Sequence, residues 1–270
     1  GNSEKLGKDS QVYEFISKKG ANASEALDFT QNYGATYWGD QPIVAAPAYI
    51  GAIVFMLFVL AMFIDKRKIK YAFLVGAVFT LMLSWGKNFA FLTNIFIDFV
   101  PFYDKFRAVS SIQVIGELCL PLLAIMGLQS FFKADKSEKI DALKKTGIVS
   151  LGSIGLLFIF KFLFDFTGPI DIRLEQMFAQ MGDPTFGNEF LDALRADRQK
   201  MYASDVLRSG VLIIITLGIL LLYTKEKLSQ FITVVLVGIF MVGDLVFVDK
   251  NYVDTSGFVS AREVREPFQP

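Results

Sequence analysis

The sequence predicts an all-α fold: a polytopic bundle of about six transmembrane helices with amphipathic helices at the membrane surface. Three observations predict it. Of the 270 residues, 53% are hydrophobic and only 20% are charged. Several uncharged or nearly uncharged runs approach or exceed the length needed to cross roughly 30 Å of hydrocarbon at about 1.5 Å per residue. The short segments between these runs alternate between basic and mixed composition, as in multi-pass membrane proteins.

The six predicted spans divide the chain into a bundle, two outer loops and two flanking regions. We expect the spans at about 43–64, 69–86, 108–132, 146–166, 208–224 and 228–248. The bundle therefore covers 43–248, with outer loops 87–107 and 167–207 and extracytoplasmic regions 1–42 and 249–270. The second span is short, and Lys70 and Lys87 stand at its ends, from which long side chains can reach the membrane surface.

Basic loops give the expected orientation, because short cytoplasmic loops are enriched in Lys and Arg. The basic loops are 65–70, 133–145 and 224–229, whereas 167–207 is rich in Asp and Glu. We therefore expect a multi-pass membrane protein with both ends outside the cytoplasm. The chain opens GNSEKLGKDS without an initiator Met or a signal sequence, so we expect it to be part of a longer protein.

Three stretches outside the spans have the pattern of interfacial helices. Phe89–Val100 is very apolar and stops at Pro101. A helical stripe of apolar residues runs from Ile172 to Met181, and another runs from Phe190 to Tyr202 after an expected cap at Asn188. These helices either cover the outer ends of the bundle or form walls of a substrate cleft.

Composition excludes several classes of function. Lys plus Arg (27) equals Asp plus Glu (27), so the chain lacks the basic field that nucleic-acid binding needs. With no His and one Cys, it also lacks the residues for Ser-His-Asp catalysis, haem ligation or a Cys/His zinc site. No cofactor is indicated, and dependence on a divalent metal stays open. Any chemistry must use carboxylates, Lys and Arg.

Ionisable residues inside predicted spans are candidates for function, because burying a charge in hydrocarbon is unfavourable. They are Glu117, Lys161, Asp165, Arg208 and Asp244. All lie in the outer half of the bundle, as expected for a cavity that receives an anionic lipid headgroup. Structural roles are the alternative: Lys161 and Asp165 can neutralise each other, and Asp244 can bond a neighbouring helix. Glu117 has no counter-charge in its span, and Pro121 removes the helical donor of its carbonyl.

Several motifs resemble a known family. They are Tyr37-Trp-Gly-Asp-Gln-Pro42, Tyr49-Ile-Gly-Ala52, Leu83-Ser-Trp-Gly-Lys-Asn88, Pro101-Phe-Tyr-Asp-Lys-Phe-Arg-Ala-Val-Ser110 and Pro121-Leu-Leu-Ala124. Together they resemble the large YfhO-type membrane proteins of Bacteroidetes, from about Tyr37 to the sixth span. The resemblance implies a location in a bacterial inner membrane, a GT-C-like architecture, and transfer of a sugar from a polyprenyl-phosphate carrier to an envelope glycan acceptor.

The resemblance also implies which residues border the substrate. Lipid-phosphate or sugar binding is carried over to five positions: Trp85, Lys87, Asn88, Lys105 and Arg107. In GT-C enzymes the catalytic carboxylate lies in the first extracytoplasmic loop, which we expect upstream of this sequence, so no catalytic residue is assigned. A Trp at a span end also occurs commonly as an interfacial anchor, which is the alternative for Trp85.

Two other functions stay open from the sequence, so it does not decide whether the protein is an enzyme. A transporter or flippase of a lipid-linked precursor would use Glu117, Lys161 and Asp244 along its path. A non-catalytic membrane scaffold would bind envelope partners through its outer helices.

Overall fold

The computed structural model describes residues 5–39, 48–105, 109–252 and 258, and every regular element among them is a helix. The chain forms two compact units, neither continuous in sequence. The first contains Leu157–Val206 with the described residues of Gly1–Pro47 and Val246–Pro270. The second contains the described residues of Ala48–Leu156 together with Leu207–Leu245.

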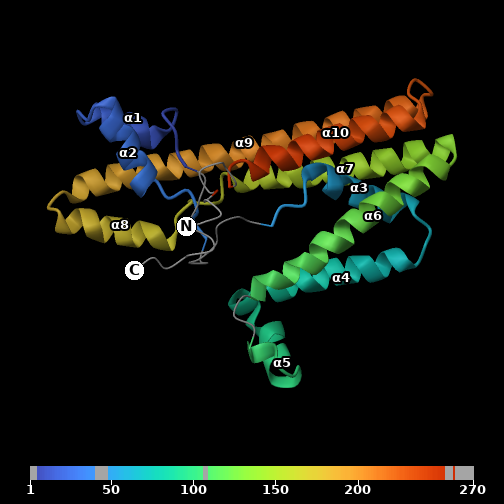
Figure 1. Ribbon diagram of the computed structural model, residues 1–270, viewed down its shortest axis with the longest axis horizontal. Coiled ribbons are helices and arrows are strands. Elements are labelled where there is room, and N and C mark those ends of the chain that lie inside the picture. Colours follow the sequence, from blue (N-terminus) through green and yellow to red (C-terminus); the bar gives the residue numbers. More distant parts are fainter. Residues whose placement is uncertain (1–4, 40–47, 106–108, 253–257, 259–270) are drawn as a thin grey trace. The chain divides into compact units, whose positions relative to one another are not determined.

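The first unit packs α1 (Gln11–Lys18) and α2 (Ala23–Tyr33) with α8 (Pro169–Gln180) and the first part of α9 (Pro184–Thr224) (Figure 1). Polar residues define where the two short helices begin. The Ser10 hydroxyl accepts from Tyr13 N, and Asn22 forms a capping box with Glu25. The core between them is aromatic and aliphatic, with Val12, Ala26, Leu174, Phe178, Phe190, Leu191 and Leu194 all buried.

The second unit contains α3 (Ala52–Ile64), α4 (Ile69–Ser84) and α6 (Gln113–Lys133), and α6 packs against both of the others (Figure 1). Gly127 allows α6 to approach α3 closely, because a Cβ there would lie 2.8 Å from the backbone N of Ala61. Small residues permit this kind of backbone contact between membrane helices.

The same unit also contains most of α7 (Lys136–Phe160), the second part of α9 and most of α10 (Gln230–Asp249). These helices lie beside one another (Figure 1) and share a core with α3 and α6. Its buried members include Ile53, Met56, Leu60, Phe131, Leu143, Ile213, Leu220 and Val237. Outward-facing residues on these helices are also apolar, for example Ile148 and Ile239, which is the surface expected of helices in lipid.

Short helices follow α4. They are η1 (Gly86–Phe89), α5 (Ala90–Phe99), η2 (Tyr103–Lys105) and η3 (Val109–Ile112). The segment Gly86–Phe99 is bent by 112° from α4, so the chain turns sharply after Ser84. This geometry corresponds either to one broken span or to a re-entrant segment.

Four described helices are long and apolar enough to cross a membrane: Ser110–Lys133, Lys136–Phe160, Pro184–Thr224 and Gln230–Asp249. The bent pair of α4 and Gly86–Phe99 raises the number to five. The prediction of an all-helical fold with apolar helices suited to a membrane is thus confirmed, whereas the predicted number of six spans is not. The missing span is α3, whose 13 helical residues reach only about 20 Å. The first five residues of the predicted span 43–64 lie outside the described part of the chain.

Two helix boundaries differ from the prediction. The expected basic loop 133–145 is mostly the first turns of α7, because its residues favour helix and Asp141 pairs with Lys145 four positions later at 2.7 Å. The expected interfacial helix ending at Tyr202 is the beginning of α9, which continues unbroken to Thr224. The predicted cap at Asn188 is wrong, because Asp183 accepts from Phe186 N at 2.9 Å and Pro184 starts the helix.

Candidate functional site

Trp85, Lys87 and Asn88 stand at the bend after α4, and all three side chains are exposed. Trp85 follows α4 directly, and Lys87 and Asn88 belong to η1. The Trp85 ring meets Phe89 edge to face, with ring centroids 6.1 Å apart. The bend therefore presents a cation, an amide and an indole together on one short turn.

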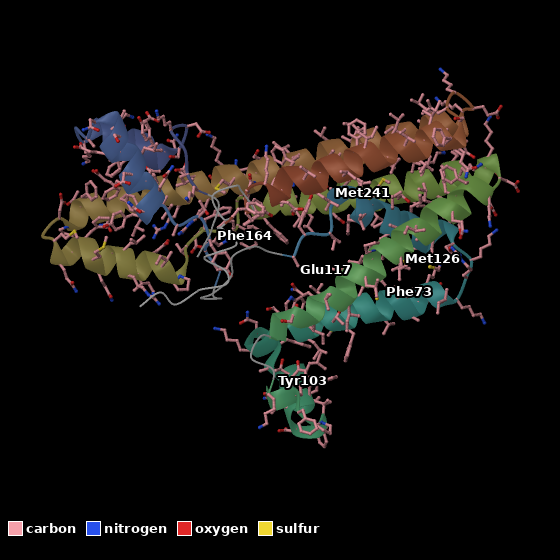
Figure 2. The ribbon with its side chains drawn as sticks, viewed as in Figure 1. Phe73, Tyr103, Glu117, Met126, Phe164 and Met241 are labelled. Carbon is pink, nitrogen blue, oxygen red and sulfur yellow. The ribbon has the colours of Figure 1, made fainter. Side chains whose placement is uncertain are left out.

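The segment after the bend is held by contacts of its own. Thr93 Oγ1 donates to the carbonyl oxygen of Gly86 at 2.9 Å, which ties α5 back to η1. The Phe96 ring lies between Phe79 of α4 and Tyr103 of η2, at 5.5 and 5.3 Å between centroids. Figure 2 shows Tyr103 near α5. These contacts fix η2 near the same segment, and Lys105 at its end is exposed. Arg107, the fifth residue predicted to bind the lipid phosphate, lies outside the described residues.

Arg208 and Asp244, predicted as separate intramembrane charges, meet in a single buried cluster of the second unit. Arg208 Nη1 of α9 donates to Asp244 Oδ1 of α10 at 3.0 Å. Tyr49 Oη lies 3.0 Å from both Asp244 oxygens, and Arg208 Nη2 lies 3.2 Å from Tyr49 Oη. The Asp244 side chain is completely buried.

The same carboxylate also caps a helix. The backbone amide of Ala52, the first residue of α3, donates to Asp244 Oδ2 at 2.9 Å. A negative charge at a helix N-terminus is favourable, because the amide dipoles point their positive ends there. Asp244 thus joins α3, α9 and α10. This is the structural role that the sequence left open for Asp244, a bond to a neighbouring helix.

Glu117 differs from Asp244 because its side chain is exposed on α6 (Figure 2). Within the described part of the chain, its carboxylate forms no hydrogen bond or ion pair. It therefore anchors no polar cluster with Trp85, Lys87 and Asn88 among the described residues. An unpaired carboxylate on a membrane helix is costly in lipid, so Glu117 stays a candidate for a functional role.

Lys161 and Asp165 lie beyond the end of α7 rather than inside a helical span. The expected neutralisation between them does not occur among the described residues. Asp165 instead accepts from the backbone N and the hydroxyl of Thr167, at 3.2 and 2.9 Å, and these bonds hold the pKa of its carboxyl below the ordinary value. The Lys161 ammonium lies over the rings of Phe158 and Phe162.

A second buried carboxylate, Asp65, was not singled out from the sequence. It follows α3 and accepts from Ser130 Oγ of α6 at 2.8 Å, from Arg67 N at 2.7 Å and from the Arg67 guanidinium. Burial alone would raise the pKa of Asp65, but the bonds from Arg67 and Ser130 outweigh it and lower that pKa. Nearby, Lys70 donates to the carbonyl oxygens of Met62 and Asp65. These two residues looked like part of a solvated basic loop.

A fully buried arginine, Arg198, was also missed. In the first unit its guanidinium bonds Asp171 of α8 at 3.1 Å, the carbonyl of Phe166 at 2.8 Å and the carbonyl of Ala35 at 2.8 Å. In the sequence Arg198 stands among many charges of a polar stretch, and only its partners distinguish it. Within the described residues, no group of Asp, Glu or Cys side chains is arranged to hold a metal ion.

Comparisons of the chain with protein-family models, with curated proteins and with solved structures found no match. The class defined by its fold is therefore the general one: an all-helical protein with apolar helices suited to a membrane.

Proposed function

We propose that this protein is a YfhO-like membrane protein that takes part in sugar transfer from a polyprenyl-phosphate carrier to an envelope glycan, at the extracytoplasmic face of a bacterial inner membrane. The turn after α4 borders the carrier phosphate in this proposal, with Lys87, Lys105 and Arg107 supplying positive charge. Asn88 and Trp85 orient the sugar or the headgroup.

One observation carries the proposal. The two most specific motifs of the resemblance lie close together in the structure. Their described residues, from Leu83 to Asn88 and from Pro101 to Lys105, belong to one compact segment around α5. The Lys87 and Lys105 side chains are both exposed in this segment. A lipid phosphate needs such accessible donors at the membrane boundary.

The chemistry is compatible with a chain that has no His. When a sugar leaves its phosphate carrier, negative charge develops on the leaving phosphate, and fixed cations stabilise that charge without transferring a proton. Lys87 and Arg107 have that role in the proposal, and no catalytic carboxylate is assigned. The identity of the sugar is set by contacts that these residues alone do not define.

The test replaces charge at the proposed site in the full-length protein carrying this sequence. Lys87→Gln combined with Arg107→Gln is expected to change envelope glycan composition and to accumulate the lipid-linked sugar. The matched control is Lys68→Gln, an exposed lysine at the other end of α4. Unchanged glycans and lipid-linked sugars in the double variant, at equal protein abundance in the membrane, would refute the site.

A flippase remains the rival function, and one observation bears on it. Asp244, one of the three residues proposed to line its path, is saturated by Tyr49, Ala52 and Arg208. A carboxylate held in that way is a structural anchor and is poorly suited to bind a passing substrate.

A further inference from the structure

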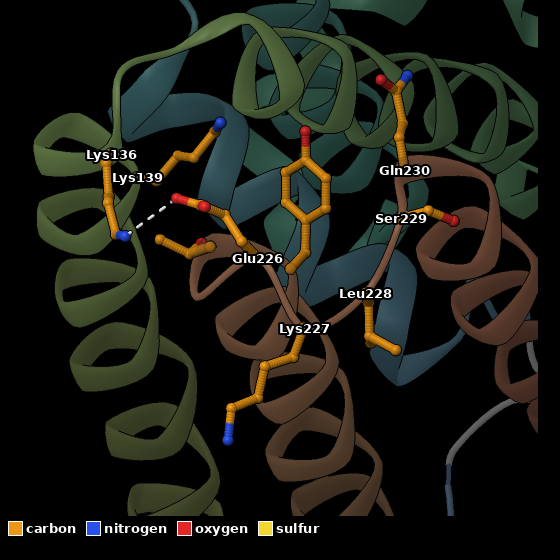
Figure 3. Close-up of a pocket in the computed structure, with 9 residues that line it drawn as sticks. Lys136, Lys139, Glu226, Lys227, Leu228, Ser229 and Gln230 are labelled. Atoms are coloured by element: carbon orange, nitrogen blue, oxygen red, sulfur yellow. Dashed lines mark hydrogen bonds and ion pairs between the residues drawn. The ribbon is translucent and has the colours of Figure 1, made fainter.

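A pocket of about 450 Å³ lies at the end of the second unit where α9 turns into α10. It is lined by the start of α7 and by the connecting turn: Lys136, Lys139, Tyr223, Thr224, Glu226, Lys227, Leu228, Ser229 and Gln230. Figure 3 shows Lys136 and Lys139 on one helix, with Lys136 directed toward Glu226 of the turn. The Lys227 side chain extends away from these two residues. None of these residues belongs to the site proposed above.

The charges of the pocket favour an anion. Three lysines stand against one glutamate. The Lys136 ammonium pairs with Glu226 Oε1 at 3.2 Å, but both side chains are mostly exposed, so this pair contributes little and can be exchanged for a stronger partner. The Lys139 ammonium is fixed 5.0 Å from the centroid of the Tyr223 ring, which places it at the wall of the pocket.

The beginning of α10 adds hydrogen-bond donors at the same wall. Ser229 precedes the helix, and its hydroxyl accepts from Ile232 N at 3.3 Å. Ser229 and Gln230 both line the pocket. The amides of a first helical turn carry partial positive charge, so they reinforce the lysines toward a phosphate.

The surface beside the pocket is that of a membrane helix. Leu221 and Leu222 precede Tyr223 and are exposed, and Phe231 follows Gln230 with 77% of its surface exposed. A polar, cationic pocket that continues into exposed apolar helix surface matches an amphiphile, with a phosphate at one end and acyl chains at the other. A free phosphate would use only the polar half of this arrangement.

We propose that this pocket binds the phosphate headgroup of an anionic phospholipid, whose acyl chains lie along the exposed faces of α9 and α10. Lys136 and Lys139 neutralise the headgroup, and the Ser229 hydroxyl and the Gln230 side-chain amide donate hydrogen bonds. The lipid then fastens α7 to the turn between α9 and α10.

The experiment measures lipid binding to the purified full-length protein by native mass spectrometry and by thermal unfolding in detergent. Phosphatidylglycerol is compared with phosphatidylcholine and with inorganic phosphate. We expect phosphatidylglycerol alone to remain bound and to raise the unfolding temperature. Lys136→Gln with Lys139→Gln is expected to weaken its binding roughly 25-fold, because each lysine near an anionic lipid contributes about 1 kcal/mol.

Two variants separate lost charge from lost structure. Lys144→Gln with Lys145→Gln removes two exposed charges from the same helix outside the pocket, and phosphatidylglycerol binding should persist. Lys136→Arg with Lys139→Arg keeps the charge and should also bind. Equal binding by the pocket variant and the unaltered protein would overturn the proposal, as would an equal loss in the Lys144 and Lys145 variant. An equal response to inorganic phosphate would overturn the assignment to a lipid. None of these outcomes depends on sugar transfer.

Discussion

The carboxylate of Asp244 caps α3 through the backbone amide of Ala52, 192 residues away in the sequence, at 2.9 Å. The same carboxylate accepts from Arg208 and Tyr49. One side chain therefore holds the beginning of α3 against α9 and α10. The order of the second unit depends on this polar contact as well as on its apolar core.

Replacing Asp244 by Ala should destabilise the protein by about 3 kcal/mol, because it removes the buried carboxylate that caps α3 and pairs with the partly buried Arg208 guanidinium. Asp244→Asn retains an acceptor for the Ala52 amide and should lose less. The loss would be measured as the free energy of unfolding in mixed detergent micelles. Asp249→Ala, an exposed carboxylate on the same helix, is the control and should change little. A similar loss in both alanine variants would contradict the role of the cluster.

Gly51 should be intolerant of substitution for a related reason. Its φ of 89° lies in the region that side chains avoid, and a Cβ there would lie 3.4 Å from Asp244 Oδ2. Gly51→Ala is expected to lower stability by roughly 1–2 kcal/mol. Gly238→Ala, inside α10 with open space around it, should be neutral or slightly stabilising. Thermal unfolding of the two variants side by side checks this difference, and equal midpoints would argue against it.

Arg198 should not be replaceable by Lys. Its guanidinium donates to Asp171 and to two backbone carbonyls from a fully buried position. A single ammonium cannot reproduce these hydrogen bonds, because it lacks the planar spread of donors. Arg198→Lys should make the first unit more susceptible to limited proteolysis. Arg173→Lys, on the exposed face of α8, serves as the comparison. Identical cleavage rates for the two variants would show that the hydrogen bonds of Arg198 are dispensable.

We expect the protein to lose stability in acid when Asp65 becomes protonated. Its pKa is lower in the folded protein than in the unfolded chain, so its contribution is complete above the ordinary carboxyl pKa of about 4 and is lost as the pH falls through the lowered value. Asp65→Asn should therefore be less stable near neutral pH and should lose less stability on acidification. Unfolding followed as a function of pH tests this, with Asp135→Asn, an exposed neighbour, as the control. Parallel acid curves for Asp65→Asn and the unaltered protein would be inconsistent with the assignment.

The sequence predicted the class of fold because hydrophobic run length and loop charge are local properties. It located α6 and α10 within a few residues, since both are apolar runs bounded by polar segments. It misjudged the start of α7 and the continuity of α9, because a charged stretch such as residues 133–145 can be loop or helix, depending on ion pairs along its own turns. The uncharged run 43–64 is long enough to cross a membrane, but the helix that forms within it, α3, has only 13 residues.

The candidate site was predictable only in part, because partners far apart in sequence decide which charges are structural. Asp244 and Arg208 looked like separate functional candidates, yet they satisfy one another. Asp65 and Arg198 looked like surface charges, yet both are buried with partners from other helices. Lys87, at the bend after α4, has an exposed side chain, and its proposed role stays a prediction.

The proposed site requires α4 to cross the membrane, so that Lys87 lies on the side opposite the basic loop 65–70. The direct measurement introduces Lys87→Cys and Lys68→Cys separately into a Cys119→Ala background, since Cys119 is the single native cysteine. Each is treated with a membrane-impermeant maleimide in right-side-out vesicles, before and after detergent. We expect Lys87→Cys to react in sealed vesicles and Lys68→Cys to react only after detergent. Reaction of both from the same side would show that α4 does not cross the membrane between Lys68 and Lys87, and would contradict the proposed arrangement of the site.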